Sequence, residues 1–273
     1  MSSNIFRFRK DSTFEESFEL SRELTDCFNY YYQPQYSLQT GVITSYECLI
    51  RYTHPKMGLQ TPDVFLSDLF TFNLWEYLWP IMLRKASTAL KLLPHNVKLA
   101  INVSPKELED GNSSSFLNTF FIMVKKGYLN PKRFDIEITE DFKIKDFSKV
   151  NNSISFLNDL GVNVIVDDFG AGFSNLTSLD ILNIQGVKID RGLVNGIENS
   201  KIKQTIVKSL VDIGNVKSAA ILAEGIETIE QEKIVKDLGC TLGQGFFFGK
   251  PKSDFVPCFT KATRRDSLSI VTS

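Results

Sequence analysis

The chain has 273 residues, of which 42% are hydrophobic, enough to bury the core of one large α/β domain or of two smaller ones. Thirty-one basic residues against thirty-two acidic ones give a net charge of -1, which argues against a protein that attracts nucleic acid polymers or anionic membranes through its global charge. The sequence contains neither a secretory signal nor an apolar run long enough to span a membrane, so we expect a cytoplasmic protein.

Eight short runs of β-branched and apolar residues recur along the chain, with helical patterns between most of them. In chain order these predicted strands cover residues 28–34, 42–51, 97–105, 133–140, 162–170, 185–190, 219–227 and 241–249. The linker between the first two is too short for a crossover helix, so they should pair as an antiparallel hairpin. The pattern predicts an α/β fold, a TIM-like (β/α)8 barrel with one antiparallel strand near the N-terminus.

The chain shows no change of composition that would mark a second domain. Amphipathic stretches at 201–214 and 228–239 each end in glycine, as helices commonly do, and belong to the same repeating pattern. We therefore expect one stand-alone domain over residues 13–262, with an N-terminal tail at 1–12 and a C-terminal tail at 263–273.

Polar residues occupy the ends of the predicted strands. Because side chains alternate along a strand, Glu47 and Arg51 point to the same side of theirs. The same parity points a polar residue of each further strand into the barrel, at the end where barrel enzymes build their active sites: Asn102, Glu137, Asp167, Lys188 and Glu224. Asp168 can join them only if the strand ends there and residues 169–172 turn the chain.

Carboxylates gathered at one mouth of a barrel cannot all stay ionised unless cations lie between them. Oxygen ligands favour hard ions such as Mg²⁺ or Mn²⁺, and two adjacent aspartates suit a pair of ions about 3.5–4 Å apart, as in two-metal hydrolysis. The four cysteines lie far apart without the spacing of a zinc site, and we expect reduced thiols. Arg51 offers a planar fork to a phosphate, and Gln244 is placed to contact a base edge or a second phosphate.

Short motifs follow one another along the chain. Residues 47–51 read Glu-Cys-Leu-Ile-Arg, and Tyr-Gln-Pro precedes them at 32–34. The later motifs are HP with a following glycine at 54–58, INVSP at 101–105, EITE at 137–140, DDFGAG at 167–172, KID at 188–190, AEGIE at 223–227 and QGFFFGKP at 244–251. In this order, the motifs resemble those of the EAL domain family of cyclic di-guanylate (cyclic di-GMP) phosphodiesterases, over almost the whole chain, with Cys48 in place of the signature alanine.

The resemblance implies hydrolysis of cyclic di-GMP to linear pGpG by a water that two Mg²⁺ or Mn²⁺ ions activate. The metal ligands that it implies are Glu47, Asn102, Glu137, Asp167, Asp168 and Glu224. The catalytic residues would be Glu47, Lys188, Glu224 and Glu140, with Lys188 holding the attacking water and Glu140 steadying the loop after the paired aspartates. Substrate contacts would come from Gln33, Arg51, Gln244 and Pro251.

The resemblance also implies a homodimer, formed through the loop and helix after Asp168. That helix would begin near Ser174, and its apolar residues would either meet a second subunit or pack on the barrel of their own: Leu176, Leu179, Ile181 and Leu182. Ala171 and Phe173 replace a threonine and a tyrosine often seen in this loop of the family, which bears on how the loop is controlled.

Two alternatives from other functional classes stay open. The domain could be a catalytically weak or inactive module that binds cyclic di-GMP or a protein. Lys188 could instead be a Schiff-base lysine of an aldolase-like barrel, but nearby carboxylates would raise its pKa, whereas that chemistry needs a lowered one. Lys188 could also simply neutralise Asp168, and Glu227 could be a further carboxylate of the mouth or an ordinary residue at the start of a helix.

Overall fold

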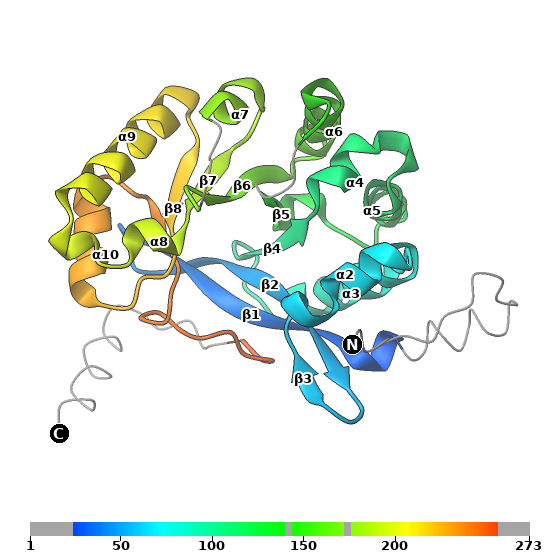
Figure 1. The fold of residues 1–273 in the computed structure, drawn as a ribbon. Coiled ribbons are helices and arrows are strands. Elements are labelled where there is room, and N and C mark those ends of the chain that lie inside the picture. The colour runs from blue at the N-terminus through cyan, green and yellow to red at the C-terminus, as the bar shows by residue number, and fades with distance from the viewer. Residues whose placement is uncertain (1–23, 140–143, 172–175, 256–273) are drawn as a thin grey trace, which may run out of the picture.

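The computed structural model describes residues 24–139, 144–171 and 176–255. In this part of the chain, eight strands close into a barrel with helices arranged around it (Figure 1). The barrel strands are β1 Phe28–Ser37, β2 Ile43–His54, β4 Lys98–Val103, β5 Phe134–Thr139, β6 Asn163–Phe169, β7 Gly186–Ile189, β8 Ala220–Ala223 and β9 Leu242–Gly243. The predicted TIM-like barrel is confirmed.

The first strand runs opposite to its neighbours and closes the barrel. β1 pairs antiparallel with β2 on one side and with β9 on the other, while β2 and the later barrel strands pair in parallel. The predicted hairpin and the single antiparallel strand are therefore confirmed. The sequence pattern missed β3, Gly58–Gln60, which folds back on the end of β2, because three residues are too few to show a periodicity.

The helices lie outside the strands (Figure 1). Their bounds are α2 Pro62–Thr71, α3 Trp75–Leu90, α4 Pro105–Glu109, α5 Ser115–Lys125, α6 Phe147–Asp159, α7 Leu176–Ile181, α8 Arg191–Val194, α9 Lys201–Lys217 and α10 Ile229–Asp237. Side chains cap several of their first turns; at α10, Thr228 and Gln231 form a capping box. Among the described residues, every helix is too short or too polar to traverse a lipid bilayer.

Glycine ends one of the two predicted helices but not the other. Gly239, with φ of 104°, follows α10 as expected. The predicted end of the other helix at Gly214 was wrong, because α9 continues to Lys217 and Ser218 takes the left-handed conformation after it. A Cβ atom on Gly214 would lie 2.5 Å from Cδ1 of Ile221 on β8, so this glycine allows close packing of the helix on the barrel.

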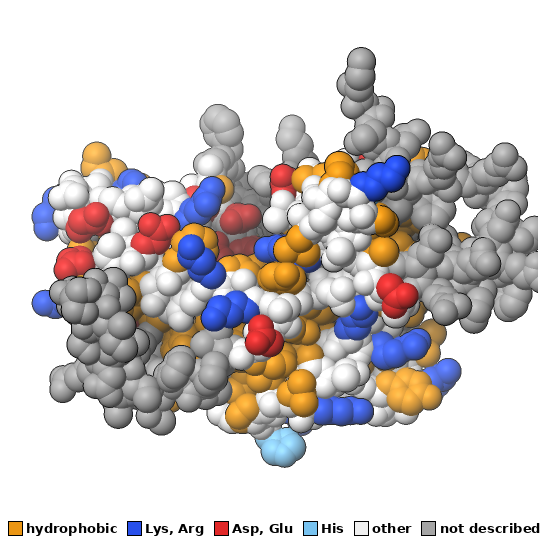
Figure 2. All heavy atoms as spheres, turned by 90° about the horizontal axis from the view of Figure 1, so that it is seen from below, with side chains coloured by type: hydrophobic (Ala, Val, Ile, Leu, Met, Phe, Trp, Pro, Cys, Tyr) orange, Lys and Arg blue, Asp and Glu red, His pale blue; other side chains and the backbone are white. Residues whose placement is uncertain are grey.

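Strand alternation divides the side chains into an outer apolar set and an inner polar set. Ile136 and Ile138 flank Glu137, and Val187 and Ile189 flank Lys188; all are buried. The apolar neighbours belong to the hydrophobic core that the helices cover. On the face drawn in Figure 2, basic and acidic side chains lie among hydrophobic ones, which agrees with the near-zero net charge.

Candidate active site

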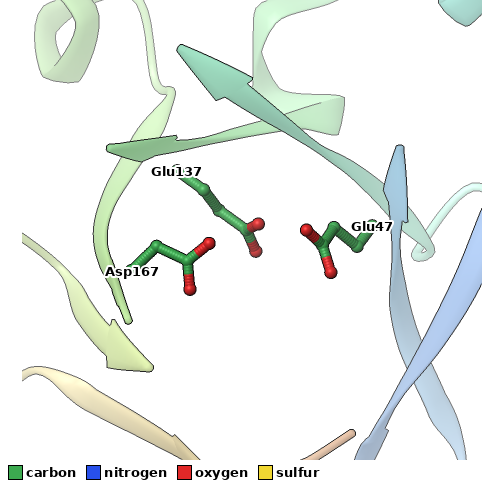
Figure 3. A group of neighbouring side chains, drawn as sticks. All are labelled: Glu47, Glu137 and Asp167. Atoms are coloured by element: carbon green, nitrogen blue, oxygen red, sulfur yellow. The ribbon is translucent and has the colours of Figure 1, made fainter. Parts of the chain in front are cut away.

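Acidic side chains from several strands converge inside the barrel. Glu47 of β2, Glu137 of β5 and Asp167 of β6 point toward one another (Figure 3), and these three offer oxygens that all lie within 4.8 Å of one another. A second group with the same spacing comprises Asp167, Asp168 and Glu224. Because Asp167 belongs to both groups, the oxygen donors suit two adjacent hard cations.

Lys188 lies among these carboxylates and is fully buried. Its Nζ is 2.8 Å from Glu224 Oε1, 2.9 Å from Asp167 Oδ1, 3.0 Å from Glu137 Oε2 and 3.6 Å from Glu47 Oε2. Burial alone would lower the pKa of this ammonium, but the four carboxylates outweigh burial and hold its pKa well above the usual value. A Schiff-base role needs a neutral amine, so this environment argues against the aldolase alternative.

Three of the carboxyl groups are harder to ionise than free ones. Burial, which Lys188 only partly offsets, raises the pKa of Glu137 and of Asp167, and raises that of Glu224 to about 8. The neighbouring carboxylates raise these pKa values further. Without cations Glu224 therefore retains its proton at neutral pH, and a cation would have to displace it.

Glu47 differs because polar groups surround its carboxylate. Burial would raise its pKa, but the ammonium of Lys188 and hydrogen bonds from Gln244 and Asn102 hold the pKa below the usual value. Asn102 Nδ2 donates to Glu47 Oε1 at 2.8 Å, and Gln244 Nε2 donates to Glu47 Oε2 and to Gln33 Oε1. The structure thus brings Asn102, Gln33 and Gln244 together around Glu47, with the amide of Gln244 bonded to protein groups.

Asp168 reaches the cluster by a different route from the predicted one. β6 does not end at Asp168 but continues to Phe169, and its pairing with β7 is irregular between Val166 and Phe169. Asp168 has a left-handed backbone with φ of 54°, and its N–H donates to Asp167 Oδ1 at 2.8 Å. This bulge, rather than a strand end, turns two consecutive side chains to the same side.

Glu224 also lies off its strand. The predicted strand at 219–227 stops at Ala223 in the structure, and the Glu224 N–H still donates to the Ile189 carbonyl of the neighbouring strand at 3.1 Å. Glu224 is therefore the first residue of the loop after β8. This position leaves its side chain more exposed than those of Glu47 and Glu137.

Two buried residues next to the cluster, Gln35 and Ser45, were not predicted from the sequence. Gln35 Nε2 donates to Glu137 Oε1 at 3.0 Å and to Gln244 Oε1 at 2.9 Å, and Ser45 Oγ donates to Gln35 Oε1. The register pairs Gln35 with Ser45 and Gln33 with Glu47 across the hairpin. A signal was present: by strand parity, two glutamines in an aromatic strand face the same way.

Two predicted substrate contacts, Arg51 and Pro251, are half-buried and belong to neither group of carboxylates. Arg51 is half-buried four residues beyond Glu47 on β2, and its guanidinium carbon is 5.6 Å from the centre of the Tyr31 ring. Pro251 is half-buried beside Lys252, which bridges to Tyr32 of β1 through backbone hydrogen bonds. The chain after β9 thus folds back onto β1.

The remaining predicted positions are of three kinds. Glu140 and Phe173 lie outside the described residues, whereas Ala171 is exposed. Glu227 is exposed just before α10 and its N–H donates to Gln231 Oε1 at 2.8 Å. Glu227 is therefore at the start of a helix and not part of the buried cluster.

Comparisons with known proteins agree on one family. The family model described as EAL domain matches residues 19–251. A cyclic di-GMP phosphodiesterase of Pseudomonas aeruginosa is 32% identical over 229 residues, which are 82% of this chain and 38% of that protein. Another from the same organism, RocR, is 30% identical over 227 residues, 82% of this chain and 57% of RocR. The chain thus spans less than two thirds of the length of these relatives.

Comparison with solved structures also finds EAL proteins. The PaMucR phosphodiesterase, in a complex with c-di-GMP, matches with a TM-score of 0.74 and 28% identity, over 86% of this chain and 96% of that chain. The EAL enzyme Bd1971, in a form with cAMP and cyclic di-GMP bound, matches with a TM-score of 0.73 and 25% identity, over 94% of this chain and 69% of that one.

Proposed function

The chain belongs to the EAL domain family, and from this we propose that it is a phosphodiesterase that hydrolyses cyclic di-GMP to linear pGpG with a water activated by two divalent cations. The observation that carries the proposal is that two clusters, each of three acidic residues, share Asp167 inside the barrel. Relatives named cyclic di-GMP phosphodiesterases, about 30% identical, support the substrate.

The cations we propose are Mg²⁺ or Mn²⁺, because every candidate ligand is an oxygen of a carboxylate or amide side chain. The residues that would hold them are Glu47, Asn102, Glu137, Asp167, Asp168 and Glu224. Such ions, when bound, lower the pKa of water and neutralise charge on phosphoryl oxygens.

The chain's own side chains would orient the reactants. Lys188 keeps its proton, so its ammonium donates hydrogen bonds and can orient the attacking water, but it cannot act as a base. Arg51, beyond Glu47 on the same strand, would bind a phosphate of the substrate with its planar fork. Gln33, Gln244 and Pro251 stay proposed substrate contacts; for the two glutamines this requires exchange of their present bonds. The role proposed for Glu140 falls outside the described residues.

Turnover is the test of this proposal. Purified protein is incubated with cyclic di-GMP and Mg²⁺ or Mn²⁺, and the product is separated by chromatography, with Asp167→Ala and Glu47→Ala as inactive controls. We expect pGpG from the wild type only. Binding of cyclic di-GMP without turnover under either cation would instead identify a binding module.

Dimerisation stays a prediction, and fewer apolar residues than expected are available for the contact. Leu179 and Leu182 are buried within their own subunit, which leaves Ile181, 40% exposed, as the apolar surface residue among the described side chains of α7. We predict that dimerisation through the helix after Asp168 raises the occupancy of the second cation and so raises activity; because such coupling is reciprocal, the cation should then tighten the dimer. Sedimentation over a range of concentrations, with and without Mg²⁺, tests this; a monomer throughout would exclude the dimer. A cytoplasmic location likewise stays a prediction.

A further inference from the structure

We propose that Gln35, which belongs to none of the motifs above, is a positioning residue of the acidic cluster. Its amide holds Glu137 directly and fixes the orientation of the Gln244 amide, which in turn holds Glu47. The proposal rests on the function proposed above, because it assigns Gln35 a role in preparing two carboxylates for cations.

Every polar atom of the Gln35 side chain has a partner. The side chain is 2% exposed, its Nε2 donates to Glu137 Oε1 and Gln244 Oε1, and its Oε1 accepts from Ser45. An amide nitrogen has two hydrogens, and both are used. The amide is therefore held from three sides.

These bonds have one consistent direction when Glu137 is ionised, as a carboxylate that binds a cation is. An ionised Glu137 accepts from Lys188 at Oε2 and from Gln35 at Oε1, so the nitrogen of Gln35 faces Glu137 and its carbonyl faces the Ser45 hydroxyl. The second N–H of Gln35 then points at the carbonyl of Gln244. This leaves the nitrogen of Gln244 to face the carboxylate of Glu47.

Without the amide of Gln35, the carbonyl of Gln244 would lose the N–H donor that holds the Gln244 amide in this orientation. Gln244 could then rotate its amide by half a turn and place its carbonyl oxygen against the Glu47 carboxylate, where two acceptors repel. Glu137 would at the same time lose the donor on its Oε1. Since Glu47 and Glu137 belong to the same three-carboxylate group, both losses affect one candidate cation position.

The position of Gln35 on the antiparallel strand β1 explains why it can reach both Glu137 and Gln244. On β1, Gln35 lies opposite Ser45 of β2, and the register shifts immediately after Gln35. β1 also pairs with β9, which precedes Gln244. The amides therefore join β2, β5 and the residue that follows β9, where the barrel closes.

The first experiment compares Gln35→Met, which keeps the length of the side chain but removes the amide, with Gln39→Met, an exposed position of the same hairpin. Mn²⁺ affinity is measured by electron paramagnetic resonance without substrate, together with kcat, KM and the melting temperature. We expect Gln35→Met to weaken Mn²⁺ binding by about tenfold or more and to lower kcat with KM little changed, because hydrogen bonds to charged groups are lost. Gln39→Met should match the wild type.

A wild type that binds Mn²⁺ and turns over, with Gln35→Met unchanged in both, would overturn this proposal and leave the proposed function intact. A wild type that binds no Mn²⁺ would overturn both. If Gln35→Met does not fold, Ser45→Ala replaces it: loss of the hydroxyl that fixes the Gln35 carbonyl should weaken Mn²⁺ binding in the same direction, and an unchanged affinity would contradict the proposal.

A double-mutant cycle tests whether Gln35 acts through Gln244. Gln244→Met is made alone and together with Gln35→Met, and Mn²⁺ affinity is measured for all four proteins. Residues in one hydrogen-bond network couple, so the combined loss should be smaller than the product of the two single losses. If the double variant loses Mn²⁺ affinity by the full product of the two single losses, the two amides act independently. That result would overturn the proposal that Gln35 acts on Glu47 through Gln244.

Discussion

Asp167 and Asp168 are consecutive residues of one strand, yet each offers a carboxylate oxygen to the same acidic group. In a regular strand, neighbouring side chains point to opposite faces. The left-handed backbone of Asp168, at φ of 54°, removes this alternation. Aspartate and asparagine tolerate that conformation better than most residues, so the position requires both a charge and a backbone preference.

These two requirements can be separated by substitution. Asp168→Asn keeps the backbone preference and removes the charge, so we expect a melting temperature at or above that of the wild type and a fall in kcat of about 100-fold or more. Asp168→Val should lose activity and also stability, because a β-branched residue is strained at positive φ. An Asp168→Asn protein with more than about a tenth of wild-type turnover would contradict the role of this carboxylate.

Arg51 should act on substrate and not on cations. We expect Arg51→Ala to raise KM by about tenfold or more while leaving Mn²⁺ affinity unchanged, because a charge-assisted bond to phosphate is lost. Arg51→Lys, which keeps the charge but not the planar fork, should recover only part of the effect. Steady-state kinetics and metal titration of the three proteins decide the matter; an unchanged KM in Arg51→Ala would rule out phosphate binding by this residue.

The metal-free protein should lose stability as pH rises. Glu224 has a folded-state pKa of about 8 against a usual value of 4.5, and the pKa values of Glu137 and Asp167 are also raised. Between these two values the folded state binds more protons than the unfolded state, so the contribution of Glu224 to the free energy of unfolding is highest below about pH 4.5 and falls until about pH 8. The raised pKa values of Glu137 and Asp167 act in the same direction. The lowered pKa of Glu47 acts in the opposite sense, at lower pH.

Melting temperatures measured in EDTA and in Mn²⁺, at pH 6 and at pH 8, test this prediction. Protein in EDTA should melt at a lower temperature at pH 8 than at pH 6, and Mn²⁺ should raise the melting temperature more at pH 8, because fewer protons must be displaced there. Glu224→Gln removes the group with the pKa of about 8 and should flatten the pH dependence in EDTA. A melting temperature in EDTA that rises between pH 6 and pH 8 would contradict the assigned pKa shifts.

Gly214 should be required for packing, although it lies inside a helix. Glycine to alanine usually stabilises a helix interior by up to about 1 kcal/mol, but overpacking against Ile221 costs about 1–3 kcal/mol, so we expect Gly214→Ala to lower the free energy of unfolding. Adding Ile221→Val, which removes the atom that clashes, should recover part of the loss. Urea unfolding measures both, with Asn215→Ala on the exposed face of the same helix as the control. A Gly214→Ala protein more stable than the wild type would refute the packing role.

The eight recurring apolar runs were enough to predict the barrel. Strand parity was enough to predict the inward direction of Glu47, Glu137 and Lys188, because each is a polar residue between apolar neighbours. It could not place Asp168, whose orientation depends on a backbone angle that no periodicity records. Nor could it extend α9 past Gly214, since the same glycine can end a helix or allow a close contact.

Gln35 was missed for a different reason. Its importance depends on contacts with Glu137 and Gln244, which are 102 and 209 residues away along the chain. Strand parity places Gln33 and Gln35 on one face, but a glutamine does not indicate a cation site by itself, whereas a carboxylate on an inner face does. Only the register of the first hairpin and the closure of the barrel bring these amides together.

Because the first and last strands pair with each other, the barrel can close only late during protein synthesis. Gln33 and Gln244, which are bonded to each other, are 211 residues apart, so a nascent chain completes the hairpin of β1 and β2 long before β9 leaves the ribosome. Until then, one edge of β1 has no partner strand and is open to pairing with other chains. Contacts of such long range also slow folding. The closure that brings Gln33 and Gln244 together thus leaves the incomplete polypeptide with an unpaired strand edge, at which other chains can pair.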